Sequence, residues 1–393
     1  MSADQTLKYT MLIFATPLFC VVDVFEHPGV VISKDRIAYV REQIANKVDP
    51  IYTAFKKSLA SPSANKTYTP KGPPPGAGIV DCGSYDHPDH GCTDEDEDGD
   101  AAAVQSLLFV LTDEKVYALN TLLILNTYAR KFHGYSNSNA PLQAAWSGCK
   151  WSRAAELMIH SQSGWSSEEA QAFIAMLYRT HLPLIYAGSG ANGNWELSMI
   201  EAMMGLAVLS DNQTLFSHAC TMWLQRIPAY IYVASDGPAP KPSPRGSPSW
   251  YGQKVFNASV TGICQETCRD LSHTQMGLAS AINSAETAHI QGVELYTQET
   301  ERLRATLELH SALLLPHAHI SSLICNGNVT IGQLPTFEIG YNDLCNRRGI
   351  ALPVTLRHLL ISVRKNPDPI NHFMIIYETL THGGSEGHEG SST

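Results

Sequence analysis

The chain has 393 residues, of which 44% are hydrophobic and only 16% are charged, and its formal net charge is −10. This composition excludes a chain that is disordered over most of its length, and the acidic balance argues against a nucleic-acid-binding protein. Six of the acidic residues lie in one run, Asp94 to Asp100, so the rest of the surface is nearly neutral. A neutral substrate, or an anionic one that is captured locally, is compatible with this distribution.

The N-terminus contains an apolar stretch over residues 11–22, preceded by Lys8, that has the length of a signal-peptide core. It is too short to cross a bilayer as a helix, and no other run approaches the ~20 residues that this needs. We therefore predict a signal peptide over residues 1–23, one domain over residues 24–384 and a disordered tail over residues 385–393. The alternative for the apolar stretch is a buried N-terminal strand or helix.

The cysteines and sequons also favour a secreted, extracellular protein without a membrane anchor once the leader is removed. Four Asn-x-Ser/Thr sequons begin at Asn65, Asn212, Asn257 and Asn328. Cys20 lies inside the predicted leader, so eight of the nine cysteines remain, enough for four disulfides. The pairs Cys82/Cys92 and Cys325/Cys345 bracket turn-rich segments, and we expect each pair to close a loop.

Helical periodicity dominates the chain from end to end, and no region shows sustained alternation of the kind that predicts strands. The predicted helices span residues 33–60, 102–111, 114–132, 152–160, 167–181, 195–210, 212–226, 272–291, 299–315 and 352–363. We expect loops over residues 61–78 and 82–100, and a Pro-rich loop over residues 236–249 that acts as a mobile lid. This succession predicts an all-α fold, an (α/α) toroid built as an incomplete barrel of helical hairpins.

Two polar blocks stand where helices begin. Asn194, in the sequence NGNWE, is expected at the N-cap of its helix, where it either satisfies backbone donors or hydrogen-bonds a substrate oxygen. The second block lies within residues 266–273, where the next long apolar helix is expected to begin, and contains Glu266, Arg269, Asp270 and His273. They form either a surface ion cluster or a catalytic group, because a neutral imidazole in the first turn of a helix suits a general base.

Two further blocks are weaker candidates. Tyr341 is a possible proton donor or else a core tyrosine, and Trp146, Lys150 and Trp151 either bind an acidic sugar or are buried. The sequence offers no recognisable metal-ligand spacing around His310, His317 and His319, so we expect no metal. It also lacks the motifs of acyl transfer, NTP binding and dinucleotide binding, so we expect no cofactor.

Taken together, these blocks resemble the alginate-lyase superfamily of polysaccharide lyases. The matching stretches, in chain order, are HPG at residues 27–29, CGSYDHPDHGC at 82–92, SNAPLQAAW ending at Trp146, AAEL at 154–157, NGNWE at 192–196, ETCRDLSHTQ at 266–275, AETAHIQGVELY ending at Tyr296, and ETLTHG at 378–383. The resemblance implies an (α/α) toroid with a substrate groove across its mouth. It also implies β-elimination on a 4-linked uronic-acid polysaccharide, alginate or glucuronan.

The resemblance further implies a role for each candidate residue. Asn194 would neutralise the substrate carboxylate, helped by Arg269 or a protonated Glu266, and His273 would be the base or a partner of the carboxylate. Tyr341 is preferred over Tyr296 as proton donor, because a continuous helix would put Tyr296 about 34 Å from His273 unless Gly292 folds the chain back. The expected substrate-binding residues are Glu266, Trp195, Lys150, Trp146, Gln143 and Arg347.

Two alternatives stay open. A glycoside hydrolase on a similar toroid would need two facing carboxylates, for which Glu196 with Glu266 or Asp270 are conceivable. A non-catalytic carbohydrate-binding protein is the other. In each case we expect a monomer whose partner is an acidic polysaccharide.

Overall fold

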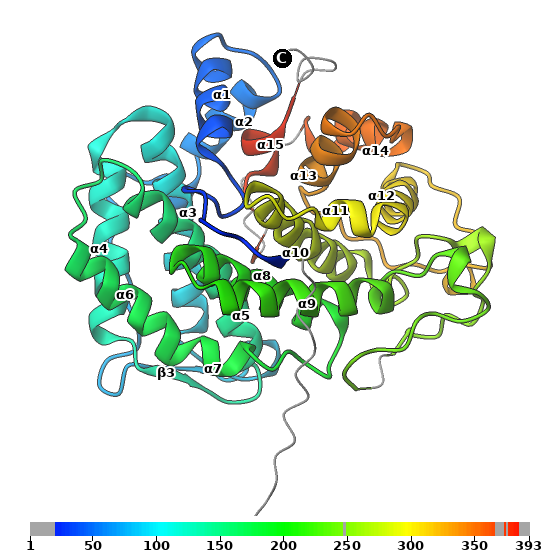
Figure 1. Ribbon diagram of the computed structural model, residues 1–393, viewed down its shortest axis with the longest axis horizontal. Coiled ribbons are helices and arrows are strands. Elements are labelled where there is room, and N and C mark those ends of the chain that lie inside the picture. The colour runs from blue at the N-terminus through cyan, green and yellow to red at the C-terminus, as the bar shows by residue number, and fades with distance from the viewer. Residues whose placement is uncertain (1–19, 247–248, 366–372, 375, 385–393) are drawn as a thin grey trace, which may run out of the picture.

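A computed structural model describes residues 20–246, 249–365, 373–374 and 376–384, and the fold is all-α (Figure 1). The helices are α1 Lys34–Ala45, α2 Ile51–Leu59, α3 Cys92–Thr112, α4 Lys115–Lys131, α5 Ala140–Ile159, α6 Ser167–Thr180, α7 Leu182–Ile185, α8 Gly193–Leu209, α9 Gln213–Tyr230, α10 Leu271–Ile290, α11 Leu295–Gln298, α12 Thr300–Leu314, α13 Glu338–Tyr341, α14 Pro353–His358 and α15 Glu378–His382. The expected toroid of helical hairpins is confirmed.

Four long helices, α3, α5, α8 and α10, form the inner layer and run in the same direction. The Cys149 thiol of α5 donates to the Ser198 carbonyl of α8, and one turn further along Arg153 pairs with Glu201. Between α3 and α5 the successive contacts are Glu95–Gln143 and Gly99–Lys150, so these two helices are parallel as well. Between α8 and α10 they are Ser198–Ser280 and Glu201–Asn283, which shows the same parallel direction. The N-termini of all four helices therefore meet at one end of the toroid.

The burial of these helices agrees with their sequences. Almost every residue of α8 is buried, which fits a helix that is apolar on all sides and packs between α5, α9 and α10. The outer helices α4, α6 and α9 each turn one apolar face inward, and Figure 1 shows them on the outside of the inner layer.

A small sheet, which the sequence analysis did not predict, lies at the end where the inner helices begin. Its strands are β1 Ile79–Cys82, β2 Asp89–His90 and β3 Gly134–Ser136, in the order β2-β1-β3. β1 pairs antiparallel with β2 and parallel with β3. Strands of two to four residues are too short for an alternating pattern to be recognised in the sequence.

Three predicted boundaries are wrong, each for a local reason. The helix expected over residues 33–60 is two helices, because the chain turns through Lys47, whose φ is +58°, before Pro50. α3 begins at Cys92 rather than near residue 102, because its acidic residues are favoured near a helix N-terminus and several find buried partners. α5 begins at Ala140, so the block around Trp146 lies within a helix.

The N-terminal segment is packed where the structure describes it. Residues 1–19 of the predicted leader and the tail over residues 385–393 lie outside the described residues. Cys20 is buried, and its carbonyl accepts hydrogen bonds from Gln213 and Ser217 of α9. Among the described residues, no helix combines the length and apolar composition needed to cross a membrane.

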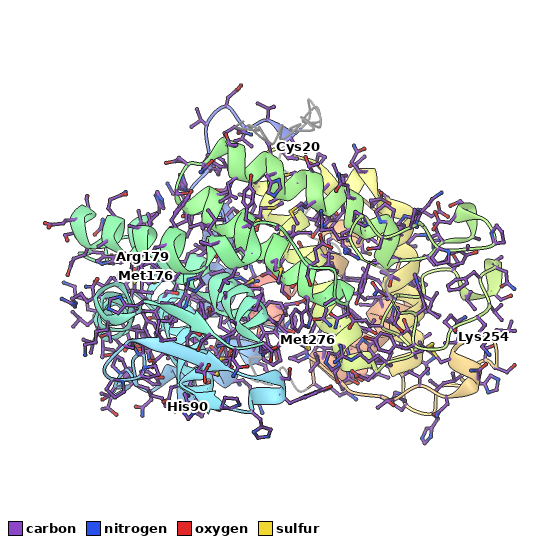
Figure 2. All side chains as sticks on the ribbon, turned by 90° about the horizontal axis from the view of Figure 1, so that it is seen from below. Cys20, His90, Met176, Arg179, Lys254 and Met276 are labelled. Atoms are coloured by element: carbon purple, nitrogen blue, oxygen red, sulfur yellow. A yellow bond between two sulfur atoms is a disulfide. The ribbon has the colours of Figure 1, made fainter. Side chains whose placement is uncertain are left out.

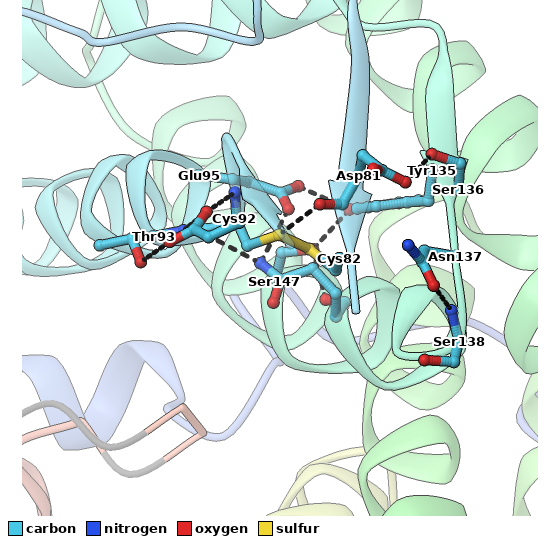
Figure 3. Close-up of a disulfide and its surroundings, with 12 residues drawn as sticks. Asp81, Cys82, Cys92, Thr93, Glu95, Tyr135, Ser136, Asn137, Ser138 and Ser147 are labelled. Atoms are coloured by element: carbon cyan, nitrogen blue, oxygen red, sulfur yellow. Dashed lines mark hydrogen bonds between the residues drawn. A yellow bond between two sulfur atoms is a disulfide. The ribbon is translucent and has the colours of Figure 1, made fainter. Parts of the chain in front are cut away.

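Two disulfides are present. Cys82–Cys92 closes the loop between β1 and α3, as predicted, and Figure 3 shows it beside Glu95 and Ser147. The predicted pairing of Cys325 with Cys345 is wrong, because Cys325 bonds to Cys268. The loop that carries Cys325 returns to the segment preceding α10, while Cys345 lies in a π-helical turn after α13 and is free.

Candidate active site

The residues with the strongest claim to chemistry lie where α8 and α10 begin. Asn194 is in the first turn of α8, His273 is in the first turn of α10, and Glu266 and Arg269 lie in the segment just before α10. The positive ends of the parallel inner-helix dipoles point to this end, so an anion is favoured there although the whole chain is acidic. In Figure 2, Met276, three residues beyond His273, lies near the middle of the molecule, whereas Lys254 lies at its edge.

Glu266 is the centre of this group and is fully buried. One of its oxygens, Oε1, accepts a hydrogen bond from the Asn194 side-chain amide at 2.6 Å, and the other, Oε2, accepts from the Asn194 backbone N–H at 3.1 Å. Burial raises the pKa of Glu266, and the nearby Arg269, His273 and Asn194 only partly oppose this. The carboxylate therefore fixes the orientation of the Asn194 amide, which leaves the second amide hydrogen for another acceptor.

The expected role of Asn194 as N-cap is wrong. The cap of α8 is Asn192, whose side chain accepts a hydrogen bond from the Trp195 backbone N–H at 3.3 Å. Asn194 is thus free of capping and is instead held by Glu266. Trp195 itself is partly buried against the core.

Arg269 completes the group on its solvent side. Its Nη1 atom donates to Glu266 Oε1 at 3.0 Å, and its side chain remains 21% exposed. Tyr230, which is fully buried, donates to Glu266 Oε2 at 3.3 Å. Arg269 is the cation of this group that can reach a ligand, because its remaining N–H donors lie on the exposed part of the guanidinium.

His273 is positioned as a base. Its Nδ1 lies 2.6 Å from Asp270 Oδ2, and the other oxygen of Asp270 accepts the His273 backbone N–H at 2.8 Å, so Asp270 is the N-cap of α10. Burial acts to raise the pKa of Asp270, but its bonds with His273 hold that pKa below its ordinary value. An ionised Asp270 selects the tautomer with the proton on Nδ1, which leaves the Nε2 lone pair of a 31% exposed ring able to accept a proton.

Tyr251 is a candidate that the sequence analysis missed. The guanidinium of Arg269 lies 5.9 Å from the centre of its ring, and its hydroxyl interacts with Arg269 and Asn192. Burial and then the charge of Glu266 raise the pKa of Tyr251, although 37% of the residue is exposed. The only sequence signal was an aromatic pair, Trp250-Tyr251, directly after the Pro-rich loop, and nothing in it indicates contact with α10.

The Pro-rich loop is fastened at both ends where it is described. Asp236 pairs with Arg302 at 2.5 Å, and Arg245 pairs with Glu196 of α8, two residues from Asn194. Glu196 is fully buried and also pairs with Arg226. The loop therefore borders the site, and lid movement stays a prediction. Both oxygens of Glu196 are paired with arginines and buried, so this carboxylate is not open to a sugar, which argues against the hydrolase that would use Glu196.

A second polar group at the start of α3 and α5 is closed. Glu95 is buried and accepts a hydrogen bond from Tyr135 at 2.5 Å (Figure 3). It also accepts one from Gln143 at 2.9 Å. The Tyr135 hydroxyl also contacts His181, whose pKa burial lowers to about 3. Burial raises the pKa of Glu95 to about 7, although these donors oppose the shift.

Lys150, expected to bind substrate, is fully buried. It pairs with Asp96 and with Asp100, the latter at 2.7 Å, so part of the acidic run serves the interior of the protein. Gln143 is likewise 2% exposed and occupied by Glu95. Neither side chain is open to a ligand in this structure.

Two other expected site residues, Trp146 and Arg347, lie apart from the α8–α10 group. Trp146 stacks on Phe373 with 3.8 Å between ring centres. Arg347 pairs with Glu286 at 2.9 Å and with Asp343 at 2.6 Å. Their positions make them internal packing and ion-pair residues.

The two tyrosines considered as proton donors also lie elsewhere. Tyr341 is 5% exposed, with Arg364 placed 5.9 Å from the centre of its ring. The chain does fold back at Gly292, but Tyr296 is buried beside Glu286 rather than near His273.

Comparisons with known proteins place this chain among the polysaccharide lyases. The family model described as alginate lyase matches residues 49–318, and the chain belongs to this family. Among solved structures, a histidine-to-alanine variant of alginate lyase A1-III complexed with tetrasaccharide is similar over 95% of this chain and 100% of its own, with a TM-score of 0.62 and 17% identity. The apo form of that variant gives a TM-score of 0.64 at 16% identity, over 94% and 99% of the two chains.

A third structure, alginate lyase A1-III from Sphingomonas species A1, covers the same shares with a TM-score of 0.58 and 15% identity. At such identities the structural likeness supports the toroid, while the family match supports the lyase class. No curated protein matches the sequence.

Proposed function

We propose that this polysaccharide lyase cleaves a 4-linked uronic-acid polysaccharide, alginate or glucuronan, by β-elimination at the α8–α10 group, and that it is secreted. The observation that carries the proposal is His273, whose Nδ1 is held by Asp270, whose ring is 31% exposed, and whose charge acts on Glu266, the residue bonded to Asn194 and Arg269. This arrangement supplies a base next to two donors suited to a carboxylate, the pair of functions that elimination from a uronate needs.

The first requirement is to neutralise the substrate carboxylate, so that the proton on C5 becomes acidic. Arg269 can donate charge-assisted hydrogen bonds, and we assign to Asn194, which is 1% exposed, the donation of the amide hydrogen that Glu266 does not use. Arg269, 3.0 Å from Glu266, counters the charge of that carboxylate and so reduces its repulsion of a bound anion. Charge that develops on the carboxylate is stabilised by donors that are already in position.

The second requirement is proton transfer at two positions. His273 Nε2 takes the C5 proton, and the imidazolium that forms is stabilised by Asp270. We assign the donor to the departing O4 to Tyr251 rather than Tyr341, because Tyr251 contacts Arg269 and Tyr341 does not lie with this group. The raised pKa of Tyr251 keeps its hydroxyl protonated and ready to donate at neutral pH.

Ultraviolet absorbance tests this proposal with alginate blocks and glucuronan as separate substrates. Elimination forms a C4=C5 double bond conjugated to the uronate, so a rise in absorbance is expected with one of them. New reducing ends without a rise in absorbance would support a hydrolase. The absence of both signals would contradict turnover of these polymers.

Tyr251→Phe tests the donor assignment. We expect kcat to fall by about 10²–10⁴-fold, the usual contribution of a general acid. Tyr186→Phe is the matched control, since Tyr186 is 47% exposed and stacks on His218 away from the site. Unchanged kcat in Tyr251→Phe would contradict the assignment without affecting the proposed reaction.

Secretion is supported by the two disulfides and by the exposure of Asn65, Asn257 and Asn328, three of the four sequon residues. Asn212 differs, because its side chain caps α9 and donates to Tyr178 at 2.9 Å. A eukaryotic secretory host should therefore attach glycans at the first three positions and not at Asn212, which mass analysis before and after glycosidase treatment would check.

A further inference from the structure

A group of histidines and carboxylates lies at the far end of the toroid from the candidate active site. Glu156 and His160 lie one turn apart at the C-terminal end of α5, and Asp211 lies in the turn between α8 and α9. His27 comes from the N-terminal segment, which Figure 1 shows in dark blue running beside α10. Three parts of the chain that are distant in sequence thus meet here.

The distances within this group are short. His27 Nδ1 lies 2.7 Å from Glu156 Oε1, and His160 Nε2 lies 3.8 Å from Glu156 Oε2. The two imidazole rings stack with 4.1 Å between their centres, so both face the same carboxylate. One ligand atom from each of the three residues lies within 4.8 Å of the other two.

The two oxygens of the Glu156 carboxylate differ in their hydrogen bonding. It is 1% exposed, and its Oε1 atom accepts from His27 and from the Gly29 backbone N–H at 3.0 Å. Its Oε2 atom is buried and has no hydrogen-bond partner among the described residues. A buried carboxylate oxygen without a donor is costly, and it lies near the negative end of the α5 dipole, where a cation is favoured.

We propose that His27, Glu156 and His160 bind a divalent transition-metal ion, and that zinc fits best. The ligands would be His27 Nδ1, a Glu156 oxygen and His160 Nε2, and two imidazoles with one carboxylate suit zinc rather than calcium or magnesium. In a tetrahedral zinc site with bonds of ~2.0–2.1 Å, neighbouring ligand atoms are about 3.3 Å apart. His27 Nδ1 is 2.7 Å from Oε1 and His160 Nε2 is 3.8 Å from Oε2, so each imidazole faces a different oxygen of the carboxylate at a distance near that spacing.

Asp211 supplies the outer hydrogen bond that metal-binding histidines usually have. Its Oδ1 atom lies 3.0 Å from His27 Nε2. A proton on Nε2 donated to Asp211 leaves the Nδ1 lone pair for the metal, which is the tautomer that binding requires. Asp211 has a φ of +51°, a conformation that Asn also tolerates, so Asp211→Asn is a mild test of this role.

The ion can enter from solvent. A hollow of ≈ 760 Å³ is bordered by His27 and His160 together with Lys34, Arg41 and Asp113, so both imidazoles line a space that is open to solvent. The metal would fasten the N-terminal segment to α5 at a site remote from His273. We therefore assign it a structural role. The sequence analysis had led us to expect no metal, so this proposal departs from that expectation.

The test uses the full chain without an affinity tag, stripped with a chelator and titrated with Co²⁺ and then with Zn²⁺. We expect one equivalent of Co²⁺ to give the visible absorption of tetrahedral coordination, Zn²⁺ to displace it, and Zn²⁺ to raise Tm. His160→Gln should weaken Zn²⁺ binding by at least about tenfold, and Asp211→Asn by about 10–100-fold.

His289→Gln is the matched control, because His289 Nδ1 also bonds a carboxylate, Glu294 at 2.8 Å, but no third ligand is grouped with them. It should bind Zn²⁺ like the wild type. The assignment is overturned if the wild type gives no cobalt spectrum, or if His160→Gln, with an unchanged Tm in chelator, gives the same spectrum and affinity.

Discussion

Two polar groups lie at the same end of the toroid and differ in one respect, which is access to solvent. The buried Glu95 accepts hydrogen bonds from Tyr135 and Gln143, and Lys150 is enclosed by two aspartates. Around Glu266, by contrast, Arg269 and His273 keep 21% and 31% of their side chains exposed. The closed group organises the inner helices, while the open group retains donors and a base for a ligand. Substitutions should therefore separate stability from turnover.

The largest effect is expected from His273→Gln. Loss of the base should lower kcat by about 10²–10⁴-fold, with the melting temperature changed little because the ring is partly exposed. Initial rates of absorbance increase measure this, and His289→Gln, on the same helix and also bonded to a carboxylate, is the control. A normal kcat in His273→Gln would make His273 a structural residue only.

Lys150→Met should lower the stability of the protein and leave its kcat unchanged, the opposite of His273→Gln. Removing the buried ammonium leaves Asp96 and Asp100 without their partner, which should lower the free energy of unfolding by about 3–5 kcal/mol. Urea denaturation measures this, with the exposed Lys115→Met as control, expected within about 0.5 kcal/mol of wild type. Folded Lys150→Met should retain its kcat; a loss of kcat with unchanged stability would mean that Lys150 reaches the substrate.

Glu95→Gln sharpens the comparison through pH. The pKa of Glu95 is raised to about 7 when folded, against about 4.3 when unfolded, so the folded form holds its proton more tightly. Its contribution to stability is present at low pH and is lost as pH rises from about 4.5 to 7. The free energy of unfolding of Glu95→Gln, taken relative to that of the wild type, should rise by roughly 3 kcal/mol over that pH interval.

Denaturation midpoints at pH 4.5 and pH 7.5 measure this difference, and the exposed Glu42→Gln provides the control. A stability difference between Glu95→Gln and the wild type that does not change with pH would mean that Glu95 is ionised in the folded protein throughout.

The smallest effect is expected from Arg245→Met. Glu196 keeps its second partner Arg226, so stability should change little, while the loop next to Asn194 is released. We expect KM to rise with kcat nearly unchanged, the pattern of lost ground-state binding. An unchanged KM would count against a role of this loop in substrate binding.

The sequence predicted the toroid because its helices are long and periodic, and it predicted the Glu266–His273 block because those residues are close in sequence. It could not predict contacts made by distant segments. Tyr251 reaches Arg269 only because the chain after the Pro-rich loop returns to α10. Tyr341 looked suitable beside Arg347, but the π-helical turn and Glu286 draw that segment into the interior.

Burial was the other quantity beyond reach of the sequence. Lys150, in the middle of α5, and Asn194, in the first turn of α8, are both buried polar residues. Nothing local in the sequence shows that the lysine is enclosed by two aspartates while the asparagine is bonded to Glu266, next to the partly exposed Arg269. Likewise Cys325 pairs with Cys268 rather than with Cys345, because the path of the intervening loop decides which thiols meet.

The most direct test of the account is the absorbance time course of wild type, His273→Gln and Lys150→Met on alginate and on glucuronan, normalised to folded protein. We expect the conjugated uronate to form with wild type and Lys150→Met on the same polymer, and His273→Gln to be slower by at least about 10²-fold. Equal rates for His273→Gln and wild type, or cleavage without a double bond, would contradict elimination at the α8–α10 group.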